Sequence, residues 1–241
     1  MGGDYMKLDS VELYHKLIEN NIYYLYHANS LTTSLGFIHN AGLLSRGAME
    51  KRNVQQTGQN SDGIDKKFNV WNDIFLDTVD LHGYRYSGYS RQNIYGPVLF
   101  ILKVNLLLDS RFNNVWITTN NPSNWNESDI EEDRYFDTVD NYIRDMGINR
   151  QQKMITIRNM NDSIPFSEYL ECIKLDNPQR CFAKPQSNVY QYAYNKLNNA
   201  VNKAALNVNV IEHKCNNCYC IENYKDMNRM ELDKYFQDYS N

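Results

Sequence analysis

"YYLYHANSLTTSLGFIHNAGLLSR", residues 23–46, joins a tyrosine-rich run to a helix-like run through a short turn. Aromatic residues favour strands, so residues 23–28 are expected to form one. Leu31, Leu35 and Ile38 then recur at the spacing of one helical face. Gly42 follows where a left-handed C-terminal cap is expected. The stretch therefore predicts a strand, a turn and a helix in succession.

The same stretch carries polar side chains at its turns. His27 lies near the end of the predicted strand, Asn29 follows it, and Ser45 and Arg46 close the stretch. A histidine can hydrogen-bond a ribose hydroxyl, and an arginine can bind pyrophosphate through two parallel bonds. The alternative is a satisfied histidine at the edge of an ordinary core. Spacing alone leaves both interpretations open.

Regular elements are expected along most of the remaining chain. Residues 47–73 show no sustained period and are predicted to form a long loop. The other expected elements are helices at 10–21, 188–207 and 226–239, strands at 96–108, 115–119, 154–159 and 208–212, and a turn of helix followed by an edge strand within 163–174.

Strands and helices are mixed without regular β-α-β repetition, which predicts the α+β class with a mostly antiparallel or mixed sheet. We expect a single domain over residues 1–241. Residues 180–241 would form a C-terminal helical extension that carries a cluster of cysteines.

Composition limits the class of protein. Hydrophobic residues make up 42% of the chain and charged residues 22%, as in globular proteins. No apolar run is long enough for a membrane span, and the N-terminus lacks the pattern of a secretory signal. Five cysteines, an odd number, fit a disulfide framework poorly. We therefore expect a cytoplasmic protein with no membrane partner.

The net charge of −4 argues against a protein that holds nucleic acid mainly through a basic face. The charge is uneven, because residues 127–145 contain eight carboxylates and two arginines. This segment is either a solvated helix-and-loop insertion or a docking surface for a partner.

"NDIFLDTVDLH", residues 72–82, places Asp77, Asp80 and His82 between apolar residues. Carboxylates near a histidine can bind a metal or act as a general acid–base pair. The alternative is a turn in which the aspartates bond backbone amides.

"HKCNNCYC", residues 213–220, contains Cys215 and Cys218 at the spacing of a zinc knuckle, with Cys220 and His213 as further soft ligands. A structural zinc ion is one interpretation, and buried or free thiols are the other. The chain contains no phosphate-binding loop, dinucleotide fingerprint or zinc-protease motif of the common kinds.

Several segments in order resemble the ADP-ribosyltransferase superfamily. The similarity is greatest to the DarT-like branch of nucleic-acid ADP-ribosyltransferase toxins. The segments that carry it are "LYHANSL" (25–31), "AGLLSR" (41–46), "GPVLFILKV" (96–104), "NNPSNW" (120–125) and "SIPFSEYLECI" (163–173).

The resemblance implies an α+β fold with a split antiparallel or mixed β-sheet, flanking helices and NAD as co-substrate. Tyr26 and His27 would hold the nicotinamide ribose. Arg46 or Arg52 would steady the pyrophosphate or the transition state. The full set of NAD-binding residues that it implies is Tyr26, His27, Asn29, Gly42, Ser45 and Arg52, with Arg46 as a catalytic residue.

The chain departs from the family at its catalytic glutamate. The strand that usually carries it corresponds to "QQKMITIR", residues 151–158, which contains no glutamate. Either Asp80 or another acid takes the role, with His82 nearby, or Gln152 positions the acceptor without acting as a base, or the correspondence is shifted.

The function implied is transfer of ADP-ribose from NAD to RNA or DNA bases, by an intracellular toxin or anti-phage effector that needs an antitoxin protein. The alternatives are a protein-directed ADP-ribosyltransferase, an NAD glycohydrolase, and a non-catalytic interaction protein with the same fold.

Overall fold

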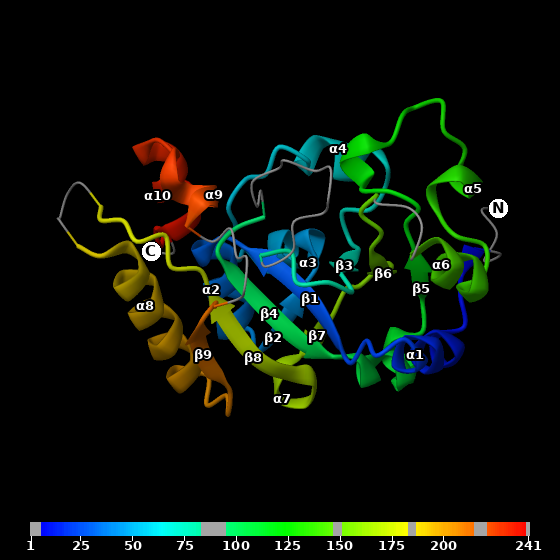
Figure 1. Ribbon diagram of the computed structural model, residues 1–241, viewed down its shortest axis with the longest axis horizontal. Helices are drawn as coiled ribbons and strands as arrows, with labels where there is room; N and C mark the ends of the chain where they lie inside the picture. Colours follow the sequence, from blue (N-terminus) through cyan, green and yellow to red (C-terminus); the bar gives the residue numbers. More distant parts are fainter. Residues whose placement is uncertain (1–5, 83–94, 147–150, 183–186, 215–220, 240–241) are drawn as a thin grey trace.

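The computed structural model describes residues 6–82, 95–146, 151–182, 187–214 and 221–239 (Figure 1). These residues form a mixed α+β structure, which confirms the predicted class. The strands are β1 (Tyr24–Asn29), β2 (Gly42–Leu44), β3 (Ile74–Leu76), β4 (Val98–Lys103), β5 (Val115–Ile117), β6 (Ile155–Ile157), β7 (Ser163–Pro165), β8 (Leu170–Leu175) and β9 (Asn209–Glu212).

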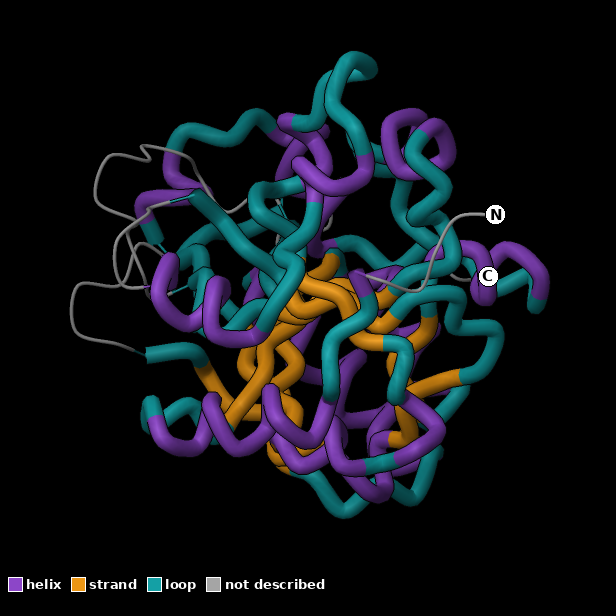
Figure 2. The backbone as a smooth tube through the Cα atoms, turned by 90° about the vertical axis from the view of Figure 1, so that its right-hand side faces the viewer, coloured by secondary structure: helices purple, strands orange, loops and turns teal. Residues whose placement is uncertain are grey.

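The described strands form three sheets. The largest has the order β1-β4-β8-β9, the second is β3-β6-β5, and β2 pairs with β7 alone. All pairs are antiparallel except β8 with β9. The strands lie in the middle of the molecule with helices around them (Figure 2).

Helices cover both ends of the molecule. Figure 1 shows α8, α9 and α10 at one end and α1, α5 and α6 at the other. The α-helices are α1 (Ser10–Glu19), α2 (Leu31–His39), α3 (Arg46–Lys51), α4 (Asp62–Lys67), α5 (Glu131–Arg134), α6 (Val139–Met146), α7 (Phe166–Tyr169), α8 (Val189–Lys203), α9 (Glu222–Lys225) and α10 (Arg229–Phe236).

The stretch 23–46 folds as its residues predict over β1 and α2. The strand predicted at 96–108 is confirmed in its first half. It forms β4, which is buried between β1 and β8, and then tightens into a 3₁₀ turn over Val104–Leu108. Near the N-terminus, the Asp9 carboxylate accepts bonds from the backbone amides of Val11 and Glu12 and so caps α1.

The structure corrects three local predictions. The residue with positive φ after α2 is Ala41 (+50°), whereas Gly42 begins β2. A Cβ atom at position 42 would lie 2.7 Å from Ser163 of β7. The close packing of the two strands therefore leaves no room for a side chain there. Residues 47–73 are not one long loop, because they contain all of α4 and all but the first residue of α3. β8 is an interior strand rather than an edge.

The acidic segment 127–145 forms α5, most of α6 and their connecting loop. Some of its carboxylates pair with cations from other segments. Glu131 lies 3.2 Å from Arg158, and Asp145 lies 2.9 Å from Lys153. These ion pairs attach part of the segment to the rest of the molecule.

A backbone bridge joins the two larger sheets. The amide of Tyr26 in β1 donates to the Asp77 carbonyl at 2.8 Å, and the amide of Asp77 donates back at 2.9 Å. Asp77 directly follows β3, so the end of the second sheet is fixed against the edge of the first. None of the described helices has the length and apolar character needed to cross a membrane.

Gly96 should be essential for stability where it packs against the end of β1. Its φ is +126°, and a Cβ there would lie 2.4 Å from the Asn29 carbonyl. We expect Gly96→Ala to lower the free energy of unfolding by about 2 kcal/mol or more, measured by urea denaturation. Gly63 in α4 is the control, because no atom lies within 4 Å of a Cβ placed there. Equal stability of the two alanine variants would contradict this account.

Candidate active site

A pocket opens beside the bridge between the two sheets. It has a volume of about 820 Å³, including the space at its open mouth. Its walls come from β1, α2, the start of α3, the segment 59–77 and the segment 121–122. The polar and charged residues in its lining are His27, Asn29, Ser45, Arg46, Gln59, Ser61, Asp65, Asp73, Asp77, Tyr95 and Asn121. The pocket therefore gathers residues that are far apart in the chain.

His27 is held as a neutral acceptor in this pocket. Its Nδ1 lies 2.9 Å from the Phe75 carbonyl oxygen, which can only accept, so Nδ1 carries the hydrogen. Burial lowers the pKa of His27, and the nearby Arg46 charge lowers it further. Nε2 is buried and has no hydrogen-bond partner among the described residues. The free lone pair on Nε2 can accept a bond from a ligand hydroxyl.

Asp77 places a buried carboxyl group in the same pocket. The residue is 5% exposed, and burial raises the pKa of its carboxyl to about 7. The Gln152 amide donates to Asp77 Oδ1 at 2.8 Å, which opposes part of that rise. Gln152 Oε1 in turn accepts bonds from Tyr95 and Asn121, both at 2.8 Å. This network fixes the orientation of Gln152, and a carboxyl that titrates near neutrality can exchange protons with a substrate.

Asp80 and His82 do not line the pocket. Leu81 between them lines the pocket, whereas both neighbours join a cluster with Asp176 and His213. His82 Nδ1 lies 2.8 Å from Asp176, and His213 Nε2 lies 2.8 Å from Asp80. Of the three candidates Asp77, Asp80 and His82, Asp77 is therefore the one that lines the pocket.

Burial and charge act in opposite directions in this second cluster. Burial acts to raise the pKa of Asp80, but the bond and charge of His213 hold it lower, at about 2. Burial acts to lower the pKa of His82, but the Asp176 carboxylate raises it overall. The cluster joins the loop after β3 to the ends of β8 and β9.

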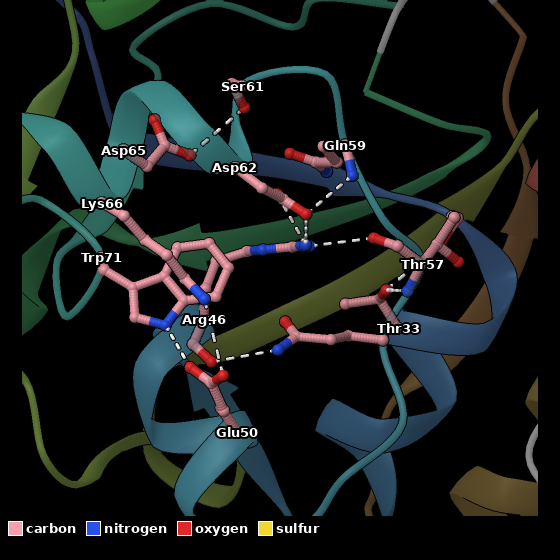
Figure 3. Close-up of polar contacts among 12 residues, drawn as sticks. Thr33, Arg46, Glu50, Thr57, Gln59, Ser61, Asp62, Asp65, Lys66 and Trp71 are labelled. Carbon is pink, nitrogen blue, oxygen red and sulfur yellow. Dashed lines mark hydrogen bonds and ion pairs between the residues drawn. The ribbon is translucent and has the colours of Figure 1, made fainter.

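Arg46 is paired with a carboxylate rather than left open for a ligand. One terminal nitrogen, Nη2, lies 2.7 and 2.8 Å from the two Asp62 oxygens, and Nη1 donates to the Thr57 carbonyl at 3.1 Å. The guanidinium carbon also lies 5.2 Å from the centre of the Trp71 ring (Figure 3). These contacts hold the arginine against the segment that leads into α4.

Two more carboxyl groups give the pocket an acidic wall. Burial raises the pKa of Asp65 to about 6, against the opposing effect of a bond from Ser61. Burial also raises the pKa of Asp73, which lies 3.2 Å from Arg158. Because Arg46 is neutralised by Asp62, the pocket favours a neutral or cationic ring over a free anion.

The remaining predicted residues divide into two groups. Asn29 and Ser45 line the pocket, and the Ser45 hydroxyl also caps α3 by accepting from the Ala48 amide. The others are not in its lining: Tyr26 takes part in the backbone bridge, Gly42 pairs within β2 and β7, and Arg52 lies 3.3 Å from Asp162 on the surface.

The predicted zinc ligands Cys215, Cys218 and Cys220 lie outside the described residues. His213, the further ligand that the sequence offers, uses Nε2 to bond Asp80. Within the described part of the chain, no group of three or more His, Cys, Asp or Glu side chains could hold a metal ion.

The buried carboxyl of Asp77 should make stability depend on pH. Its folded pKa lies above its unfolded value, so ionisation favours the unfolded chain as pH rises. We expect the unfolding free energy of the wild type to fall relative to Asp77→Asn between pH 4 and 7, and then to level off. The difference should reach a few kcal/mol, at about 1.4 kcal/mol per pKa unit.

Urea denaturation across this pH range measures the effect, with Asp133→Asn as the control. Asp133 is an exposed residue of α5. A constant difference between wild type and Asp77→Asn from pH 4 to 8 would rule out a buried, proton-binding Asp77.

Comparisons with known proteins add no identification, because neither a scan against protein-family models nor a search of the curated proteins finds a match. An account of function therefore depends on the chemistry of the pocket itself.

Proposed function

We propose that this protein transfers ADP-ribose from NAD to a nucleic acid. The observation that supports the proposal best is the placement of His27 and Asp77 in one pocket. His27 contributes a free acceptor nitrogen, and Asp77 contributes a carboxyl with a pKa of about 7. The order of the segments that resemble the ADP-ribosyltransferase superfamily supports the same reaction.

The pocket suits the nicotinamide end of NAD. The nicotinamide ring of NAD carries a positive charge, which the carboxylates of Asp65 and Asp77 would attract when ionised. His27 Nε2 would accept a hydrogen bond from a hydroxyl of the adjoining ribose. Asn29 and Ser45 would lie along the same wall, as the resemblance implies.

Asp77 would act as the general base. The bond between ribose C1′ and the nicotinamide nitrogen breaks, and neutral nicotinamide leaves with the electron pair. A nucleophilic atom of the acceptor attacks C1′, and its proton passes to the Asp77 carboxylate. Gln152 would hold that carboxylate through its amide, a role different from the positioning of the acceptor considered for it from the sequence. Asp77 thus takes the role for which the sequence offered Asp80.

Arg46 would have a conditional role. It lines the pocket, but Asp62 occupies its guanidinium. To bind the pyrophosphate, Arg46 would exchange this carboxylate for a phosphate, which presents the same two-oxygen geometry. The resemblance further suggests an intracellular toxin or anti-phage effector, held inactive by an antitoxin protein.

Transfer of label from NAD tests the reaction. We expect NAD labelled in its adenylate part to mark single-stranded RNA or DNA, and Asp77→Asn to lower the rate by about 100-fold or more, because the base is lost. Asp133→Asn should retain the wild-type rate. Label on protein, or free ADP-ribose, would identify the transferase of proteins or the NAD glycohydrolase instead. Absence of NAD cleavage with every acceptor would favour a non-catalytic protein.

The rate should also depend on pH in one direction. A base works when deprotonated, so the initial rate should rise through about pH 7 and then level off as Asp77 ionises. Burial lowers the pKa of His27, so this histidine is neutral around pH 7. Initial rates between pH 5.5 and 8.5 measure the profile, and a rate that falls with rising pH would exclude Asp77 as the base.

A further inference from the structure

A second pocket adjoins the first. It has a volume of about 990 Å³, including its open mouth. Four residues line both pockets: Gln59, Ser61, Tyr95 and Asn121. A ligand in the second pocket would therefore lie against the wall that separates it from His27 and Asp77.

The two pockets differ in charge. The described lining of the second contains amide and hydroxyl side chains, the rings of Tyr95 and Tyr235, and one charged group, Lys234. It contains no carboxylate, whereas three carboxyl groups line the first pocket. The second pocket thus suits a polar, uncharged ring with an attached anion.

Several of its polar groups are available to a ligand. No carboxylate of the described chain lies within ion-pair distance of Lys234, and the side-chain amides of Gln59 and Asn60 bond no other described residue. An amide offers both a donor and an acceptor, as the edge of a nucleobase does. A lysine donates to phosphate, and a tyrosine ring can stack on a base.

Helix α10 brings Lys234 and Tyr235 to this pocket and is firmly attached. Asn228 and Glu231 form a reciprocal capping box at its start, and Phe236 is fully buried at its end. The Thr32 hydroxyl in α2 then donates to the Gln237 carbonyl at 2.9 Å. The helix lies beyond residue 175, where the resemblance to ADP-ribosyltransferases ends.

We infer that the second pocket binds a nucleotide of a single-stranded nucleic acid. Gln59 and Asn60 would meet the edge of the base, Tyr235 its face, and Lys234 the phosphate beside it. The C-terminal helix is then part of the acceptor site. This inference rests on the proposed function, because the acceptor must lie next to the pocket in which NAD is cleaved.

Binding without NAD tests the inference independently of the reaction. Fluorescently labelled single-stranded RNA and DNA 12-mers of mixed sequence are titrated with the full chain, and anisotropy gives the Kd. We expect Lys234→Glu to raise the Kd about tenfold. The slope of log Kd against log salt concentration should fall by about one, the value for one lost phosphate contact. Asn60→Ala, at an exposed position, should weaken binding by a smaller factor.

Lys203→Glu is the matched control, because Lys203 is exposed in the last turn of α8 and lines neither pocket. Melting temperatures confirm that each variant is folded. Equal affinity of Lys234→Glu and Lys203→Glu, or binding of an unstructured peptide in preference to both oligonucleotides, would overturn the inference.

The two proposals fail in different ways. If label is transferred to nucleic acid but the Kd does not change in Lys234→Glu, the inference of a nucleotide site in the second pocket is wrong and the proposed reaction is supported. If Lys234→Glu weakens binding but NAD is not cleaved, the proposed reaction is wrong and the nucleotide site is supported.

Discussion

The two hydrogen bonds between the backbones of Tyr26 and Asp77 determine how the rest of the site is arranged. They fix the end of the three-stranded sheet against the edge of the four-stranded sheet. His27 follows Tyr26, and its ring adds a third bond across the same junction through Phe75. Two side chains separated by fifty positions in the chain thereby face one pocket. The position of the pocket is thus a consequence of how two sheets meet.

Burial gives this junction its chemical character. Water would stabilise an ionised Asp77 and a protonated His27. Both side chains are buried, so neither charged form is stabilised by water. The carboxyl therefore retains its proton to about pH 7, while the imidazole loses its proton more readily than in water. Gln152 limits the effect on Asp77 by donating a hydrogen bond. The same desolvation that makes these groups costly to bury makes them suited to proton transfer.

Local sequence predicted the elements that local forces determine. Side-chain spacing and strand propensity were sufficient for β1, α2 and α8. They left open whether His27, Asn29 and Ser45 share a site, and the resemblance was what grouped these residues, which line one pocket. Gly42 misled the prediction of the helix end, because its reason is the approach of Ser163, 121 residues away. The short helix α4 was missed because its six residues bury no side chain and leave no apolar period.

The choice among Asp77, Asp80 and His82 could not be made from the sequence. All three occur in one apolar frame, and their directions depend on distant partners. Asp80 is drawn away by His213, which is 133 positions later, and His82 by Asp176. Asp77 alone is directed to the pocket by its bridge to Tyr26. Such long-range contacts have no signature within an eleven-residue window.

The wall shared by the two pockets has a thermodynamic consequence. Gln59 and Ser61 line both, and the segment that carries them also holds Arg46 through Thr57 and Asp62. A ligand that shifts this segment from one side changes the surface offered on the other. Any resulting change in affinity must be reciprocal, because the free energy of the doubly occupied state does not depend on the order of binding. Residues 57–62 are thus the part of the chain through which binding in one pocket would affect binding in the other.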